Sequence, residues 1–120
     1  MRRKRPFNRA ERIGGLMRDE VARIVQYELR DAVCRHVHVT GTRLSGDLAH
    51  LKVHWVMEDG SESDSATAAL ERSAGYVGRT LRDTFDLRRN PTVVFYFDRE
   101  FARMERIEAL LAGDKKAESD

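Results

Sequence analysis

The chain has 120 residues, a length typical of one domain with a single modest core. Charged residues make up 35% of it, but the formal net charge is only +2, so total charge alone does not indicate a nucleic-acid binder. The single cysteine, Cys34, excludes an internal disulfide. No apolar run approaches the roughly 18 residues needed to span a bilayer, and no signal-peptide pattern follows the basic start. We therefore expect a soluble, cytoplasmic protein without a membrane partner.

Residues 1–8 are expected to form a flexible basic arm. Four consecutive cations, Arg2, Arg3, Lys4 and Arg5, repel one another, and Pro6 stops a helix from reaching back. The arm is either a tail that binds phosphates by releasing counterions or a solubilising terminus, and the sequence does not separate the two.

A first helix is predicted to begin after Asn8, because Asn8 and Glu11 have the spacing of a capping box. Its end is expected near Arg30 or Asp31. Apolar residues between these limits recur with a period near 3.6 and form one stripe, which we assign to the core. They are Ile13, Met17, Val21, Ile24 and Leu29.

Two strands are predicted next, over residues 37–44 and 48–57, with turn residues between them. Their apolar residues alternate with polar ones, so the hairpin should have one buried face and one wetter, mildly basic face. Gly41 interrupts the first strand, as at a bulge or a close backbone approach.

Two histidines are expected to meet on the open face of this hairpin. If the hairpin turns about Gly46, His38 lies opposite His54. Because no acidic or cysteine ligand in the hairpin obviously completes a metal site, we favour a solvated or RNA-facing pair.

A long helix is predicted after the acidic loop at residues 58–65, where Ser63, Asp64 or Ser65 can supply the cap. Gly75 and Gly78 interrupt its pattern, at a cost of roughly 1 kcal/mol each relative to alanine. Its apolar face consists of Leu70, Ala74, Val77, Leu81 and Phe85.

The last elements are a strand over residues 92–97 and a helix that Asp98 can cap, with Gly113 as its expected end. The predicted fold class is α+β: a three-stranded sheet with helices packed on one face and a helical crossover between the second and third strands. Residues 9–112 are expected to be one domain, and residues 113–120 a flexible charged tail.

Four strings in this order resemble the ribosome-binding factor A family of bacterial small-subunit assembly proteins. They are ERIGGLMRDEVARIVQYELRD, VTGTRLSGDLAHLKVHW, ALERSAGYVGRTL and PTVVFYFDREFARMERIEALL. The resemblance implies a KH-like fold of type II topology, in which a kink in the middle helix replaces a Gly-x-x-Gly loop. The family marks this kink with Ala-x-Gly, and the matching positions are Ser73, Ala74 and Gly75. Serine, which stands where alanine is usual, can donate to a carbonyl one turn earlier and bend the helix. Gly78 is then secondary to Gly75.

The resemblance also implies a function. Family members bind 16S rRNA of the immature small (30S) ribosomal subunit near its neck, promote late maturation including 5′-end processing, and support growth at low temperature. The implied partners are this subunit, its rRNA and other assembly factors, and we expect a monomer without cofactor or metal.

Catalysis is not expected, because the sequence has no nucleophile elbow, phosphate loop or Gly-x-Gly-x-x-Gly motif between strand and helix. A small hydrolase is the least favoured hypothesis. Cys34 beside Arg35 and His36 could have a lowered thiol pKa, but a structural cysteine is the favoured interpretation.

Arginines on the long helix lie away from its apolar stripe, which fits either RNA binding or a solvated face partly neutralised by Asp83 and Asp86. The resemblance favours RNA. Tyr76 is the one aromatic residue expected to be free to stack a base, so recognition should rely on RNA backbone and shape. The alternative is a protein adaptor that uses the open sheet face or the hairpin edge. The candidate RNA-binding residues are Arg72, Ser73, Gly75, Arg79, Arg82, Arg88 and Arg89, with Arg2, Arg3, Lys4 and Arg5 of the arm.

Overall fold

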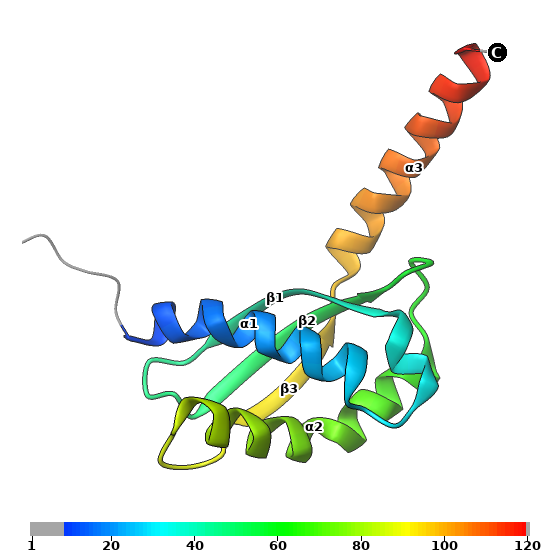
Figure 1. The fold of residues 1–120 in the computed structure, drawn as a ribbon. Coiled ribbons are helices and arrows are strands. Elements are labelled where there is room, and N and C mark those ends of the chain that lie inside the picture. Colours follow the sequence, from blue (N-terminus) through cyan, green and yellow to red (C-terminus); the bar gives the residue numbers. More distant parts are fainter. Residues whose placement is uncertain (1–8, 120) are drawn as a thin grey trace, which may run out of the picture.

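A computed structural model of the protein describes residues 9–119, apart from the side chains of residues 9, 107, 110 and 112–119. Figure 1 shows the elements, whose order is helix, short 3-10 helix, two strands, helix, strand and helix. Their bounds are α1 Arg9–Tyr27, η1 Ala32–His36, β1 Val37–Leu44, β2 His50–Met57, α2 Asp64–Phe85, β3 Thr92–Phe97 and α3 Arg99–Ser119.

The three strands form one mixed sheet with β2 in the centre. β1 pairs antiparallel with β2, whereas β3 pairs parallel with it. A parallel pair needs a crossover connection, and α2 supplies it between β2 and β3. This confirms the predicted α+β fold and its helical crossover.

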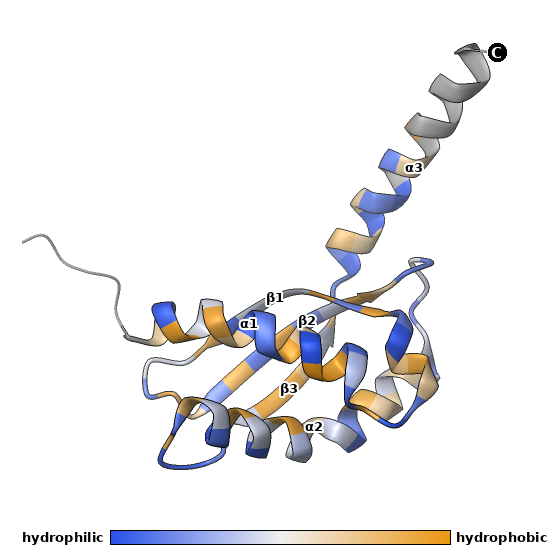
Figure 2. Ribbon diagram, viewed as in Figure 1, coloured by the Kyte–Doolittle hydropathy of each residue, from blue (hydrophilic) through white to orange (hydrophobic). Residues whose placement is uncertain are grey.

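Helices α1 and α2 lie side by side on the same face of the sheet (Figure 1). Figure 2 shows their hydrophobic positions turned towards the strands and their hydrophilic positions turned away. Trp55 is fully buried between these layers and meets the edge of the Phe97 ring, with 5.1 Å between ring centroids. The predicted stripes are confirmed as core: Met17, Val21 and Ile24 of α1 and Leu70, Val77 and Leu81 of α2 are fully buried.

The first helix ends at Tyr27, three to four residues before its expected end. The side chain of Arg35 in η1 donates to the carbonyl oxygen of Val25, in the last turn of the helix, and to that of Leu29, just after its end. The five-residue helix η1 was not predicted, since so short an element has no periodicity to detect. The expected cap, Asn8, lies outside the described residues.

The second strand begins at His50, not at Leu48 as predicted. Leu48 has a left-handed backbone with φ of 64°, which no strand accommodates. The carboxylate of Asp47 stabilises this turn by accepting hydrogen bonds from the Ser45 hydroxyl at 2.6 Å and the Ala49 amide at 3.0 Å.

The strand register differs from the expected one at the histidines. A bulge lies between Val39 and Gly41, as the sequence indicated, and it shifts the pairing by one residue. The hairpin also turns about Asp47 and Leu48, not about Gly46, since Leu44 pairs with Leu51. With both changes, His38 lies opposite Val56, and Gly41 lies opposite His54. The predicted pairing of His38 with His54 is wrong.

The last helix begins as predicted, because the Asp98 carboxylate accepts a hydrogen bond from the Phe101 amide at 3.0 Å. It does not end at Gly113 but continues to Ser119. A glycine costs about 1 kcal/mol inside a helix but does not by itself end one. Figure 1 shows that α3 extends away from the sheet and the other helices. Three large hydrophobic side chains of α3 are exposed: Phe101, Met104 and Leu111. Within the described residues, no helix has the length and apolar character of a membrane span.

Candidate nucleic-acid interface

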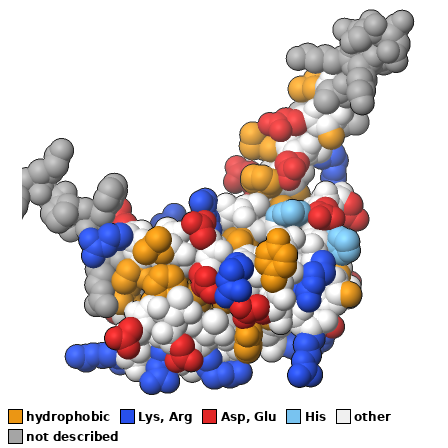
Figure 3. Space-filling view, viewed as in Figure 1, with side chains coloured by type: hydrophobic (Ala, Val, Ile, Leu, Met, Phe, Trp, Pro, Cys, Tyr) orange, Lys and Arg blue, Asp and Glu red, His pale blue; other side chains and the backbone are white. Residues whose placement is uncertain are grey.

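The outward face of α2 carries the arginines that the sequence singled out. Arg72, Gly75, Arg79 and Arg82 are all at the surface of the helix, and their spacings of three, four and three residues place them on one face. Figure 3 shows Lys and Arg side chains along the lower margin of the molecule, over α2 and the loop that follows it. The structure therefore brings these four residues together, away from the buried stripe.

Most of the arginines in this region have no acidic partner. Arg72 is the exception, because its guanidinium lies 3.0 Å from the carboxylate of Asp31. Among the described residues, no carboxylate lies within 4.0 Å of Arg79 or Arg82, so the expected partial neutralisation by Asp83 and Asp86 does not take the form of ion pairs. Unpaired guanidiniums keep their charge and donors available for an anionic ligand.

Arg88 and Arg89 extend this surface beyond the end of α2. The helix is capped at Asp86, whose left-handed backbone with φ of 53° turns the chain into the loop. Both arginines are exposed there and line a hollow of about 410 Å³, with Asp47 and Leu48 of the hairpin turn among its other walls. We refer to Arg72, Gly75, Arg79, Arg82, Arg88 and Arg89 together as the α2 face.

The side chain of Ser73 makes a hydrogen bond within the helix. Its hydroxyl donates to the carbonyl oxygen of Ala69 at 2.8 Å, the contact to the preceding turn that bends helices. Helical structure nevertheless continues without a break from Asp64 to Phe85. A kink at Ser73 to Gly75 is therefore at most a bend within one continuous helix.

The two glycines of α2 have different packing environments, which the sequence analysis did not distinguish. At Gly75, an added Cβ would meet only the guanidinium of Arg79, at 3.4 Å. Gly78 is buried, and an added Cβ would lie 2.7 Å from the carbonyl oxygen of Pro91. The fold requires glycine at position 78, whereas at position 75 it only tolerates glycine.

Tyr76 is 40% exposed, but its hydroxyl ties α2 to the segment after α1. It donates to the carboxylate of Glu28 at 2.6 Å, and Glu28 also pairs with Arg23 at 2.6 Å. The hydrogen bond from Tyr76, followed by that from Arg23, lowers the pKa of Glu28, and the same bond to Glu28 raises the pKa of Tyr76. The ring expected to stack a base is thus held by a structural contact.

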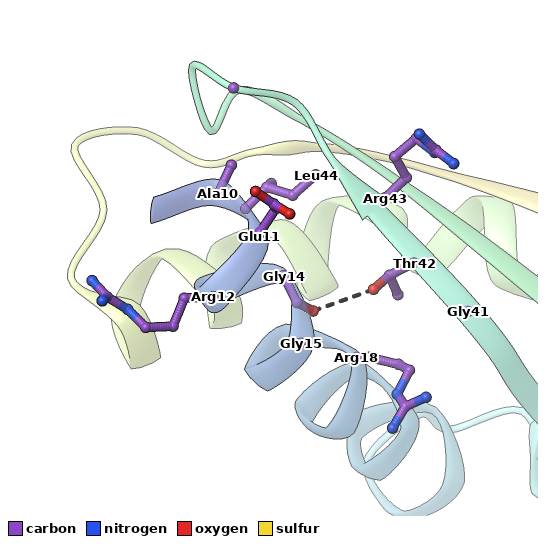
Figure 4. A pocket seen from close by; sticks show the side chains of 11 residues that line it. Ala10, Glu11, Arg12, Gly14, Gly15, Arg18, Gly41, Thr42, Arg43 and Leu44 are labelled. Carbon is purple, nitrogen blue, oxygen red and sulfur yellow. Dashed lines mark hydrogen bonds between the residues drawn. The ribbon is translucent and has the colours of Figure 1, made fainter. Parts of the chain in front are cut away.

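A groove that the sequence analysis missed lies between the start of α1 and β1. Figure 4 shows Arg12 and Arg18 projecting from α1 and Arg43 from β1, with the Thr42 hydroxyl donating to the Gly14 carbonyl oxygen at 3.3 Å. The groove has a volume of about 770 Å³, and four glycines are among its lining residues. Its sequence signal was the pair Gly14 and Gly15 beside arginines outside the apolar stripe.

The cysteine and the histidines form neither an activated nucleophile nor a metal site in the described part of the chain. Cys34 is fully buried, and burial raises its thiol pKa, which supports a structural cysteine rather than an activated one. His36 and His38 both contact the carboxylate of Glu58, at 2.9 and 3.4 Å. The described residues contain no group of three or more potential ligands that could hold a metal ion. The arm residues Arg2, Arg3, Lys4 and Arg5 lie outside the described residues.

The fold and the α2 face define a KH-like α+β domain with a basic surface on its middle helix. A sequence model of the family described as "Ribosome-binding factor A" matches residues 9–111. The protein of that name from Thioalkalivibrio sulfidiphilus is 36% identical over 118 residues, which are 97% of this chain and 89% of that protein. The one from Thermosynechococcus vestitus is 38% identical over 106 residues, 86% of this chain and 84% of that protein. This chain belongs to the ribosome-binding factor A family.

Solved structures agree with the fold. The crystal structure of ribosome-binding factor A from Thermus thermophilus superposes with a TM-score of 0.63 at 24% identity, covering 72% of this chain and 93% of that one. A second structure of the Thermus thermophilus protein, a homology model fitted into the cryo-EM map of its complex with the 30S subunit, superposes with a TM-score of 0.60. It is also 24% identical, over 73% of this chain and 93% of that one.

Proposed function

We propose that this protein is a non-catalytic assembly factor that binds 16S rRNA of the immature small ribosomal subunit through the α2 face. The observation that carries this proposal is the row of exposed arginines, most of them without acidic partners, on α2 and the loop after it. Gly75 lies within this row and lacks a side chain, so an RNA backbone can approach the helix between the arginines. Family membership and the 30S complex of the Thermus thermophilus protein support the same function.

We base the proposed role in the cell on membership of the family. The protein acts in the cytoplasm as a monomer, promotes late maturation of the subunit including processing of the 16S rRNA 5′ end, and supports growth at low temperature. It uses no cofactor and catalyses no reaction itself. Cells without it should accumulate 16S rRNA with an unprocessed 5′ end, which primer extension measures.

Co-sedimentation with purified small subunits tests the binding surface directly. Replacement of Arg79, Arg82 and Arg88 together by glutamate should abolish binding, because the surface that neutralises phosphates then repels them. The matched control replaces Arg30, Arg103 and Arg106, three exposed arginines outside the α2 face, and should bind nearly as well.

Salt dependence provides the second readout. If several arginines each neutralise a phosphate, the logarithm of the binding constant should fall steeply and linearly with the logarithm of salt concentration. A pure protein adaptor would keep its partner after the triple charge reversal. Retained subunit binding by the folded variant would contradict the proposed function.

A further inference from the structure

The sheet face opposite the helices is the most unusual surface left unexplained. Side chains alternate along a strand, so the residues between the core positions point to this face. On β2 and β3 they include Lys52, His54, Val94 and Tyr96, and Arg43 and Gly41 pair with Lys52 and His54 from β1. Both helices packed on the sheet cover its other side (Figure 1).

Two cations lie directly opposite each other on this face. Arg43 of β1 and Lys52 of β2 are register partners, and both are exposed. Among the described residues, neither has a carboxylate within 4.0 Å. Like charges in directly opposite positions destabilise a sheet. An anion bound between them would relieve this repulsion.

Two stacked rings lie next to these cations. His54 and Tyr96 are register partners on β2 and β3, with ring centroids 5.7 Å apart and an angle of 27° between the rings. Tyr96 is 43% exposed. On the other side of His54 lies Gly41, and even an added Cβ there would meet nothing within 4 Å. The ring pair is thus open to a planar ligand from solvent.

Acidic groups border this face: Glu105 of α3 lines a hollow with His38 and Val56, and three others have partners. Glu58 contacts His36 and His38, and Asp98 accepts hydrogen bonds from the Thr40 hydroxyl at 2.7 Å and the Phe101 amide. At the hairpin end, the Asp47 carboxylate is bonded to Ser45 and Ala49. The central part of the face therefore combines positive charge with exposed rings. None of the strand residues named above as forming this part is acidic.

We propose that this sheet face binds a short single-stranded segment of RNA. A base stacks on the outer face of the Tyr96 ring, whose inner face stacks on His54, and the phosphates beside it contact Lys52 and Arg43. Lys52 and His54 are two residues apart on one strand, a distance of about 7 Å. One or two nucleotides are therefore long enough to contact both the cations and the ring pair. A duplex hides its base faces, which makes an unpaired strand the matching ligand. The proposal rests on the proposed function and gives the protein a second RNA contact, on the side away from the α2 face.

The first test measures binding of a fluorescein-labelled oligouridylate to the full chain by anisotropy, with an RNA duplex of equal length for comparison. Tyr96→Ala should weaken binding of the single strand roughly tenfold, since each base–aromatic stack contributes about that much. Tyr96→Phe, which keeps the ring, should bind like the parent protein. Lys52→Ala should reduce the slope of the salt dependence by about 0.7, the value for one phosphate of a single strand.

A control on α2 separates the two surfaces. In a chain that carries Arg79→Ala with Arg82→Ala, Tyr96→Ala should still weaken binding of the oligouridylate roughly tenfold, because the two surfaces bind RNA independently. In the parent protein, the ring signals of Tyr96 and His54 in NMR spectra should shift when the oligouridylate is added, a readout that needs no variant to fold. The proposal is wrong if the single strand does not bind at low salt. It is equally wrong if Tyr96→Ala binds unchanged, or if only the α2 variant loses binding.

Crosslinking on the subunit identifies what covers the face. Val94 is 42% exposed beside the ring pair, and Val94→p-benzoylphenylalanine places a photoreactive group there while Tyr96 stays intact. An adduct with rRNA supports the proposal, and an adduct with a ribosomal protein overturns it.

If the chain binds oligouridylate through Tyr96 but binds no small subunit, the proposed function fails and the RNA-binding sheet face remains. If it binds subunits through α2 but not oligouridylate, only the sheet-face proposal fails.

Discussion

Gly78 of α2 faces the carbonyl oxygen of Pro91 so closely that a Cβ at this position would lie 2.7 Å from it. Pro91 is buried and directly precedes β3, so this contact fixes the distance between the crossover helix and the strand that it leads to. The oxygen belongs to the backbone and cannot move aside as the end of a flexible side chain could.

Gly78→Ala should therefore destabilise the protein. The clash displaces α2 from β3 at a cost of about 1–3 kcal/mol, typical of an overpacked core, and the gain in helix propensity of about 1 kcal/mol offsets only part of it. Urea unfolding should give a lower midpoint than the parent protein. An unchanged or higher midpoint would show that the helix and strand can separate freely at this position.

Gly75→Ala should have the opposite effect on stability. The new methyl group meets only the mobile end of Arg79, so the helix gains about 0.5–1 kcal/mol. If RNA approaches the helix at Gly75, small-subunit binding should weaken several-fold although the protein is more stable. Thr84→Ala, an exposed change on another side of α2, should raise stability without changing binding. Full binding by Gly75→Ala would remove this glycine from the interface.

Tyr76→Phe should change how stability depends on pH. The hydrogen bond from Tyr76 holds the pKa of Glu28 below its ordinary value of 4.5, so the ionised carboxylate stabilises the fold above that pH. This contribution is lost as the pH falls through the lowered pKa. Without the Tyr76 hydroxyl, the pKa of Glu28 rises towards its ordinary value. The variant should therefore lose less stability than the parent protein when the pH is lowered.

Urea midpoints at neutral pH and between about pH 5 and pH 2 measure this difference. The variant should be less stable than the parent at neutral pH, and the gap should narrow in acid. Tyr27→Phe is the matched control, because Tyr27 is 74% exposed and so contributes little through its hydroxyl. A gap that stays constant with pH would contradict the assigned role of the Glu28 carboxylate.

Ser63→Ala should destabilise α2 at its start. The Ser63 hydroxyl accepts a hydrogen bond from the Ala66 amide at 3.1 Å, and loss of such a cap typically costs about 1 kcal/mol. Ser63→Asp keeps an acceptor and adds a negative charge near the positive end of the helix, so it should restore the parent midpoint. Equal destabilisation by both changes would mean that the cap does not contribute.

Local patterns in the sequence predicted most of the elements and their buried faces. Leu70, Val77 and Leu81 repeat with the helical period, so their common face was evident before any contact was known. The interruption of β1 at Gly41 was also recognisable, since a glycine within a strand indicates a bulge. Alternation along β3 already placed Tyr96 opposite the core face, but its exposure was overlooked.

For the candidate site, the sequence identified arginines that share one side of α2, because spacing along a helix decides which residues are neighbours. It did not identify which of them have acidic partners. Asp31 is 41 residues from Arg72, and Glu28 is 48 residues from Tyr76, so only the packed fold brings these groups together.

What the sequence by itself determined is thus the order of the elements and the side that each one buries, since both follow from the period of the local backbone. The tertiary structure decided the strand register, the open ring pair on the sheet and the role of the glycines. The hairpin turns about Asp47 and Leu48 instead of Gly46, and this turn together with the one-residue bulge placed His38 opposite Val56 instead of His54. The requirement for glycine at position 78 comes from a carbonyl 13 residues along the chain, which reaches it only after β3 has packed against α2.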